Sequence, residues 1–269
     1  MGRPHLEHLH TPEVPWVPLA WPGWPPGARV KALSQDAESG AVSALVELPA
    51  GYALPAGCHA TERELLVLEG ALRVGAVERG SLYWDLAPAG APLEPVEALA
   101  PTTLLFFART GPPAFVPAPA PGPAATPAVD PPGRLRVAAG SLPWTGNPID
   151  DGPPAVRVKV LRLHPETGEL AALVEDSVEP YSVYEFHDCV EEVFLISGDL
   201  TLGNSGEMLP GSYFWRPPYI THGMSTSRGG SFYYVYCDSE LINHRTDAMT
   251  RTAAENRAQV ARNAASASR

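Results

Sequence analysis

Four side chains in the second half of the chain have the types and spacing of a metal site. Glu185 and His187 are two residues apart, so on a β-strand their side chains point to the same face. Glu191 begins the next run of apolar residues, and His222 follows a Pro-Gly turn. Imidazole nitrogens and carboxylate oxygens that converge in one cavity suit Fe²⁺, Mn²⁺, Ni²⁺ or Zn²⁺. We therefore predict that one divalent metal ion binds at this position.

The role of Glu185 has two interpretations. As a ligand it completes a site of two histidines and two carboxylates, and as a free carboxylate it would be the general base. Arg216 is a candidate catalytic and substrate-binding residue, because a guanidinium group can bind a substrate carboxylate. A surface ion pair is an equally good interpretation of Arg216. Tyr184 and Trp215 are further candidates for substrate binding.

The sequence repeats at a constant offset of 128 residues. His59 and Gly70 in the first half recur as His187 and Gly198 in the second. An offset held without gaps over this length indicates two copies of one structural unit. Positions that match between the copies therefore indicate architecture, and positions that differ indicate function.

The two copies differ at the candidate ligands. The differences are Gly57 opposite Glu185 and Arg63 opposite Glu191 at the offset of 128, and Ala91 opposite His222 when a hairpin three residues longer in the second copy is allowed for. A single histidine beside an arginine is a poor metal site, because the guanidinium charge repels the ion. We predict that the metal lies in the second copy and that the first copy is a scaffold.

The sequence around these residues resembles the two motifs of cupin proteins. His187 matches the second histidine of the first motif, Glu191 its glutamate and Gly198 its glycine, whereas Glu185 replaces its first histidine. His222 matches the histidine of the second motif. The duplicated layout resembles bicupins of the RmlC-like cupin superfamily, in particular the DUF4437 and anti-sigma-like (ChrR-type) cupin proteins. This resemblance implies two tandem jelly-roll β-barrels and a mononuclear metal site.

Short apolar runs must form the elements that position these side chains. Runs such as Ala41–Leu48, Thr102–Phe107 and Ser231–Cys237 are separated by prolines and glycines. Such runs are typical of β-strands in a sandwich or barrel, and the body of the chain lacks helical periodicity. The fold class expected is all-β, with two tandem cupin barrels.

The repeat and a change in composition divide the chain into four parts. These are a degenerate N-terminal barrel at 1–110, a Pro/Ala-rich linker at 111–133, a metal-binding barrel at 134–245 and a C-terminal tail or short helix at 246–269. We expect the linker to be extended, because proline-rich segments adopt extended conformations.

Charge and composition restrict the partners. The chain of 269 residues has a formal net charge of -11, which argues against binding to nucleic acid. It has no apolar run of the length that spans a bilayer, and its N-terminus does not resemble a signal peptide, so we expect a cytoplasmic protein without a membrane partner. Exposed edge strands make a homodimer possible.

The sequence predicts a mononuclear metal-dependent cupin enzyme that acts on a small organic substrate. A metal held by two histidines and one or two carboxylates leaves positions open for O₂, water or substrate. We favour a dioxygenase with Fe²⁺ that acts on a dicarbonyl, an enol or a catechol-like compound. The alternatives are a non-oxidative lyase, isomerase or hydrolase, and a non-catalytic protein that senses a metal or ligand.

Overall fold

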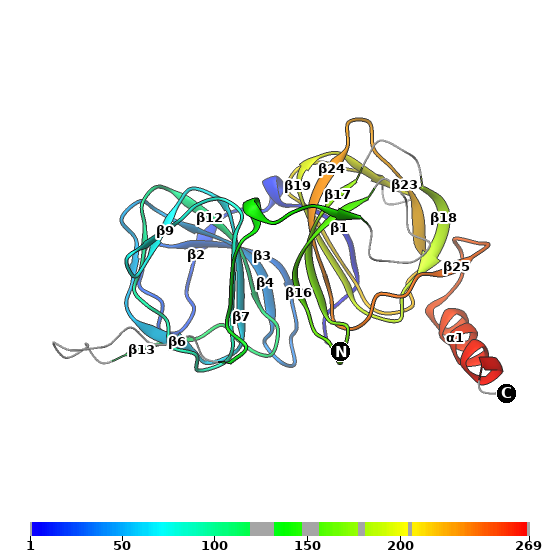
Figure 1. Ribbon diagram of the computed structural model, residues 1–269, viewed down its shortest axis with the longest axis horizontal. Coiled ribbons are helices and arrows are strands. Elements are labelled where there is room, and N and C mark those ends of the chain that lie inside the picture. Colours follow the sequence, from blue (N-terminus) through cyan, green and yellow to red (C-terminus); the bar gives the residue numbers. More distant parts are fainter. Residues whose placement is uncertain (1, 119–131, 147–155, 177–180, 204–205, 268–269) are drawn as a thin grey trace. The chain divides into compact units, whose positions relative to one another are not determined.

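The computed structural model describes residues 2–118, 132–146, 156–176, 181–203 and 206–267 (Figure 1). Within these ranges the regular structure is mostly antiparallel β-sheet, which confirms the predicted all-β fold class. The chain divides into two compact units. The first unit is Met1–Pro4 with Val14–Leu142, and the second is His5–Glu13 with Pro143–Arg269. No helix in the described ranges has the length and apolar character needed to cross a membrane.

The first unit is built on a seven-stranded sheet. In order across the sheet, its strands are β14 (Leu135–Ala138), β10 (Tyr83–Ala87), β7 (Arg63–Glu69), β12 (Thr102–Ala108), β4 (Val42–Leu48), β3 (Arg29–Gln35) and β2 (Val17–Pro18). A smaller sheet contains β5 (Ala53–Leu54), β11 (Val96–Ala98), β8 (Leu72–Val74) and β9 (Val77–Arg79). Alternate residues of the central strands, such as Val46, Val67 and Phe106, form the core.

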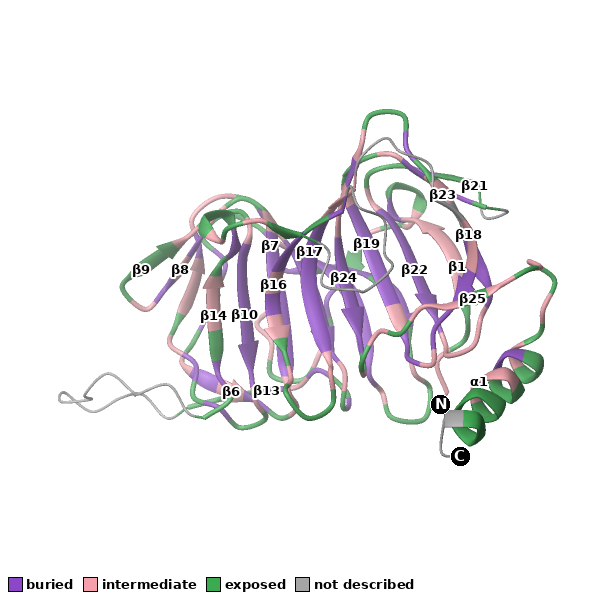
Figure 2. Ribbon diagram, turned by 45° about the vertical axis from the view of Figure 1, so that its right-hand side comes forward, coloured by how far each residue is buried: buried purple, intermediate pink, exposed green. Residues whose placement is uncertain are grey.

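The second unit repeats this arrangement. Its seven-stranded sheet contains, in order, β1 (Leu6–His10), β22 (Ser212–Arg216), β19 (Glu191–Gly198), β24 (Ser231–Cys237), β17 (Leu170–Asp176), β16 (Arg157–Leu163) and β15 (Thr145–Gly146). The opposing sheet contains β21 (Gly206–Met208), β20 (Leu200–Leu202), β23 (His222–Thr226), β18 (Tyr181–Phe186) and β25 (His244–Thr246). Short 3₁₀ turns, η1 (Thr11–Glu13) and η2 (Ala139–Ser141), follow β1 and β14. Figure 2 shows the central strands of both units as largely buried.

The first strand of each sequence copy lies in the other unit. β1 pairs with β22, with Leu6 opposite Trp215, whereas β14 pairs with β10, with Arg136 opposite Asp85. The predicted boundaries at 110 and 134 therefore require correction, because His5–Glu13 contributes to the second unit and the residues up to 142 contribute to the first. The repeat predicts how many units there are, but it does not show which unit a terminal strand joins.

The predicted linker is partly structured. Phe115–Pro117 forms β13, which pairs with β6 (Gly57–His59), and Phe115 is buried against a small apolar cluster. The linker residues 119–131 lie outside the described residues. The high proline content of the segment argues against a strand in the sequence. A proline at the end of a strand is nevertheless tolerated, because it need not donate a hydrogen bond to a neighbouring strand.

The C-terminal segment forms a helix, α1 (Ala253–Ala267), which is mostly exposed (Figure 2). Thr252 and Glu255 form a capping box at its start: the Thr252 N–H donates to the Glu255 carboxylate at 2.8 Å, and the Glu255 N–H donates to the Thr252 hydroxyl at 3.3 Å. The buried Asn256 side chain donates to the carbonyl of Tyr219 at 2.9 Å and to the hydroxyl of Thr221 at 2.8 Å. The helix is therefore fixed to the segment that leads into β23.

Two matched glycines have the architectural role that the repeat predicts. Gly70 and Gly198 have φ angles of 85° and 81°, in the left-handed region that favours glycine. A Cβ at Gly198 would lie 2.0 Å from the Gly230 carbonyl oxygen, and one at Gly70 would lie 2.4 Å from that of Pro101. Each unit therefore needs a glycine where these strands end.

Candidate metal centre

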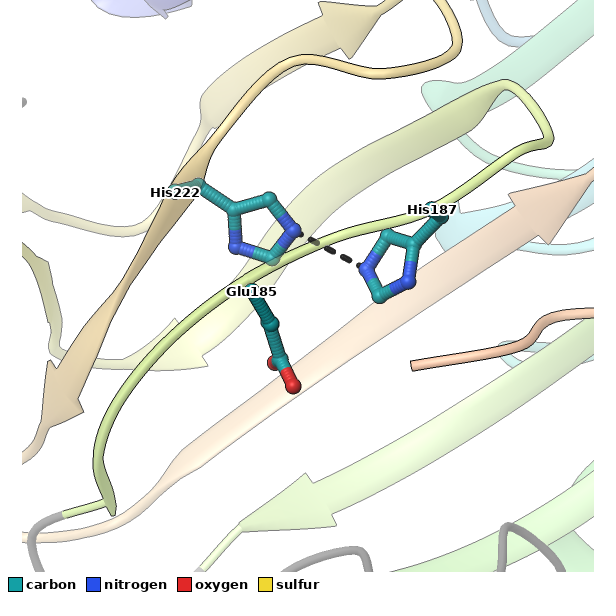
Figure 3. A group of neighbouring side chains, drawn as sticks. All are labelled: Glu185, His187 and His222. Atoms are coloured by element: carbon teal, nitrogen blue, oxygen red, sulfur yellow. Dashed lines mark hydrogen bonds between the residues drawn. The ribbon is translucent and has the colours of Figure 1, made fainter. Parts of the chain in front are cut away.

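Three of the predicted ligands converge inside the second unit. Glu185 lies on β18, His187 follows the end of that strand, and His222 begins β23. β18 and β23 pair in antiparallel register with Glu185 opposite His222. Each residue offers a ligand atom, and these atoms lie within 4.8 Å of one another (Figure 3). All three side chains are buried, and the two imidazole rings face each other in Figure 3.

The backbone sets the tautomer of His187. Its Nδ1 lies 3.2 Å from the carbonyl oxygen of Ile242, which can only accept a hydrogen bond. Nδ1 therefore carries the proton, and the lone pair of Nε2 faces Nε2 of His222 at 2.9 Å. A partner of this kind is typical of metal-binding histidines, because it orients the ring and fixes the coordinating nitrogen.

The electrostatic environment keeps both imidazoles neutral. Burial lowers the pKa of His187, although the charge of Glu191 opposes this effect. Burial, followed by the charges of Arg216 and His187, holds the pKa of His222 well below its usual range. Since only a neutral imidazole can coordinate a metal, both rings are in the required state at neutral pH.

Glu191 lies beside these three residues and belongs to an ion pair. Its carboxylate is 2.9 Å from the Arg216 guanidinium and 3.7 Å from Nε2 of His222. Glu7 on β1 binds the same guanidinium at 2.6 Å. Arg216 is almost completely buried and lies 3.9 Å above the ring of Phe214. Its charge is therefore engaged by two carboxylates, and the predicted role as a clamp for a substrate carboxylate has no support in this geometry.

Tyr184 and Trp215, the other predicted substrate-binding residues, do not line the cavity at this site. Glu185 lines the cavity, and Tyr184 precedes it on the same strand, so the two side chains point to opposite faces. Phe214 and Arg216 line the cavity, and Trp215 between them faces away for the same reason.

The cavity has a volume of about 140 Å³ and an amphipathic lining. Its walls are mostly aliphatic, with Val158, Ala172, Val193, Leu202 and Val235 among them. The candidate ligands, Glu191 and Arg216 line its polar part, together with Tyr233. Burial, followed by the charges of Asp176, Glu191 and Glu185, raises the pKa of Tyr233 above its usual range. Its hydroxyl group therefore stays protonated and can donate a hydrogen bond.

The first unit has different chemistry at the corresponding positions. Arg63 donates to Asp85 at 3.1 Å, and Arg134 donates to the same carboxylate at 2.7 Å. Burial, followed by the charges of both arginines, lowers the pKa of His59 to about 3. Among the described residues, the group of three in the second unit is the only close cluster of potential ligands.

Two contributors to the site were absent from the sequence-based prediction. Glu7 lies more than 200 residues from Arg216 and reaches it only through the exchanged strand β1. Ile242 contributes a carbonyl oxygen, which no side-chain pattern reveals. The repeat gives one signal for Glu7. β1 and β14 lie at matching positions of the two copies, so both are expected to be strands of the same kind.

Residues 7–244 match a family described as a domain of unknown function, DUF4437. The chain belongs to the DUF4437 family. No curated protein matches it significantly. The match extends over both units, and it agrees with the resemblance to DUF4437 proteins in the sequence.

Solved structures show the fold that this DUF4437 protein shares. A Nostoc punctiforme protein described as a "putative dioxygenase" has a TM-score of 0.79 and 18% identity, with 92% of each chain covered. Oxalate decarboxylase from Bacillus subtilis has a TM-score of 0.59 and 12% identity, covering 88% of this chain and 78% of that one. The Lactobacillus farciminis enzyme has a TM-score of 0.60 and 12% identity, with 90% and 88% covered. At these identities the similarity shows a cupin-like fold and not an activity.

Proposed function

We propose that this protein is a mononuclear metal-dependent enzyme that uses O₂ to oxidise a small, uncharged organic substrate in the cavity of the second unit. The observation that carries the proposal is the buried group of Glu185, His187 and His222, in which the Ile242 carbonyl directs one imidazole lone pair toward the other ring. This donor set suits Fe²⁺ or Mn²⁺, and Mn(II) centres are described for the Bacillus subtilis oxalate decarboxylase.

The charges around the cavity favour a neutral substrate. Glu185, Glu191 and Asp176 line it, and Arg216 is the one cation among its described lining residues. Because Arg216 is already bound by Glu191 and Glu7, no arginine or lysine among the described lining residues is left to pair with the second charge of a dianion such as oxalate. A neutral enol or 1,3-dicarbonyl compound fits the aliphatic walls better, since its apolar part would replace water there.

Individual residues have distinct roles in this proposal. His187 and His222 would hold the metal, with Glu185 as third ligand, and a bound ion would supply Lewis acidity and a position for O₂. The Tyr233 hydroxyl would donate a hydrogen bond that orients a substrate oxygen. Glu191 would accept a proton from an enol, because its carboxylate lines the cavity 3.7 Å from Nε2 of His222. The aliphatic walls would exclude water from the reacting atoms.

Metal analysis with oxygen-consumption assays tests the proposal. Protein purified without an affinity tag should contain about one metal per chain or take it up from Fe²⁺ or Mn²⁺, and it should consume O₂ with one of a panel of dicarbonyls, enols and catechols. His187→Ala should lose the metal and the activity, whereas His59→Ala, at the corresponding position of the first unit, should keep both. Absence of a metal that neither ion restores would refute the proposal. Turnover that proceeds equally well without O₂ would replace it with non-oxidative chemistry.

A further inference from the structure

The first unit contains a buried cluster with more positive than negative charge. Arg63 on β7 and Arg134 just before β14 both donate to the carboxylate of Asp85 on β10, at 3.1 and 2.7 Å. The exposed fractions of these three side chains are 5%, 1% and 4%. Two guanidinium groups therefore share one carboxylate in a site with little access to water, where an unbalanced charge is unfavourable.

A small cavity of about 40 Å³ adjoins this cluster. Arg63, Asp85 and Arg134 all line it, and Nε of each arginine and one oxygen of Asp85 are buried without a hydrogen-bond partner. Glu94, the other acidic residue in the lining, is paired with Arg136 at 2.9 Å. The cavity is mostly apolar, and the buried arginines with their excess positive charge adjoin it.

The cluster is the charge inverse of the corresponding group in the second unit. There an arginine lies between two carboxylates, and here a carboxylate lies between two arginines. The groups are Glu191–Arg216–Glu7 in the second unit and Arg63–Asp85–Arg134 in the first. The group beside the candidate metal centre thus has a net negative charge, and the group in the first unit has a net positive charge. The two groups are therefore suited to ligands of opposite sign.

We propose that the first unit binds a small monovalent anion of the carboxylate class, held by Arg63 and Arg134. The charge of one such anion balances the excess positive charge, and its oxygens accept hydrogen bonds from the guanidinium groups. The cavity has room for about three water molecules, which is enough for formate and too little for an aromatic or dicarboxylate anion. His59 also lines the cavity and stays neutral, since the same two arginines help to lower its pKa to about 3. The positive charge therefore comes from the arginines alone.

Calorimetric titration of the full-length protein with sodium formate tests this proposal. His222→Ala is used as the background, so that formate cannot bind to a metal in the second unit. One saturable site per chain is expected, and formamide, which is similar in size but neutral, should not bind. Arg134→Met should weaken formate binding at least tenfold. Arg109→Met is the matched control, because Arg109 pairs with Glu64 and does not line the cavity.

Asp85→Asn should change the affinity for formate in the opposite direction to Arg134→Met. Removing the carboxylate raises the excess positive charge, so formate should bind several-fold more tightly and should raise the midpoint of thermal unfolding more than in the parent protein. If Arg134→Met does not fold, the formate affinity of Asp85→Asn tests the proposal instead. The absence of saturable formate binding by the folded parent protein, or equal affinities in the parent, Arg134→Met and Asp85→Asn proteins, would overturn the proposal. Either result would leave the metal centre of the second unit unaffected.

Discussion

At the scale of the residue, neighbouring groups decide what each histidine can do. His187 and His59 occupy matching positions, and both are buried and neutral. His187 has a carbonyl partner on Nδ1 and a second imidazole opposite Nε2, whereas His59 packs among the rings of Trp24 and Phe115. The same residue type is therefore suited to bind a metal in one unit and to fill an aromatic core in the other.

Substitution of Glu185 separates its two possible roles. We expect Glu185→Gln to lower metal occupancy at least tenfold, because an amide oxygen is a weaker ligand than a carboxylate and the site loses a negative charge. Metal content per chain is measured after dialysis against a weak chelator. Asp176→Asn, which also removes a carboxylate from the cavity wall, is the control and should keep the metal. Full occupancy with loss of turnover in Glu185→Gln would instead assign the general-base role to this residue.

Acid stability reports on His59. Its pKa is lowered from 6.5 to about 3 in the folded protein, so only the unfolded chain takes up this proton between those pH values. The contribution of His59 to the free energy of unfolding therefore decreases as the pH falls below 6.5. The decrease is about 1.4 kcal/mol per pH unit until the pH nears the folded-state pKa. His59→Leu removes the titrating group and keeps an apolar side chain. Denaturant unfolding at pH 7 and pH 4.5 should show a smaller acid loss in the variant, by about 2 to 3 kcal/mol. An equal loss in both proteins would contradict the assignment.

At the scale of the element, the exchanged strand β1 supplies a charge to the candidate metal centre. Glu7→Gln keeps the strand and removes one of the two carboxylates on Arg216. Glu191 alone would then compensate the charge of Arg216. The guanidinium group would hold Glu191 more tightly, and its less compensated positive charge would repel a metal ion. We expect metal affinity to fall several-fold while the thermal midpoint changes little. Competition with a fluorescent chelator measures the affinity, and Glu13→Gln is the control because Glu13 is exposed beyond the strand. Equal affinity in both variants would show that Arg216 is insulated from the metal.

Helix α1 holds the segment before His222. Asn256→Ala removes three side-chain hydrogen bonds, two donated to Tyr219 and Thr221 and one accepted from Arg251, which should destabilise the protein by about 1 to 2 kcal/mol. Because Tyr219 and Thr221 lie three residues and one residue before His222, we also expect weaker metal binding. Asn263→Ala on the exposed part of the helix is the matched control. Chemical denaturation and metal titration of both variants measure the two effects. A loss of stability without any change in metal affinity would limit the helix to a structural role.

At the scale of the whole molecule, the sequence predicts the number of units and the location of the candidate metal centre, but not the boundaries of the units. The repeat locates Glu185, His187 and His222 because these ligands lie near one another in sequence or follow a recognisable turn. Glu7 and Arg134 escape this reasoning, since each acts in the unit to which its own sequence copy does not belong. Alternation along a strand places Tyr184 on the face opposite Glu185, so the prediction that both line the site could have been rejected from the sequence alone.

The exchange predicts which fragment of the chain folds by itself. A fragment of residues 14–142 retains β14 beside β10, the Arg134–Asp85 pair and the buried Phe115. A fragment of residues 1–110, cut at the boundary that the repeat suggests, lacks all three and exposes the edge of β10. We expect 14–142 to give a cooperative thermal transition and dispersed amide resonances. The fragment 1–110 should aggregate or unfold without a transition, because Asp85 keeps only one of its two arginines and the edge is open to pairing with other chains. Equal stability of the two fragments would show that the exchanged strand contributes nothing to the first unit.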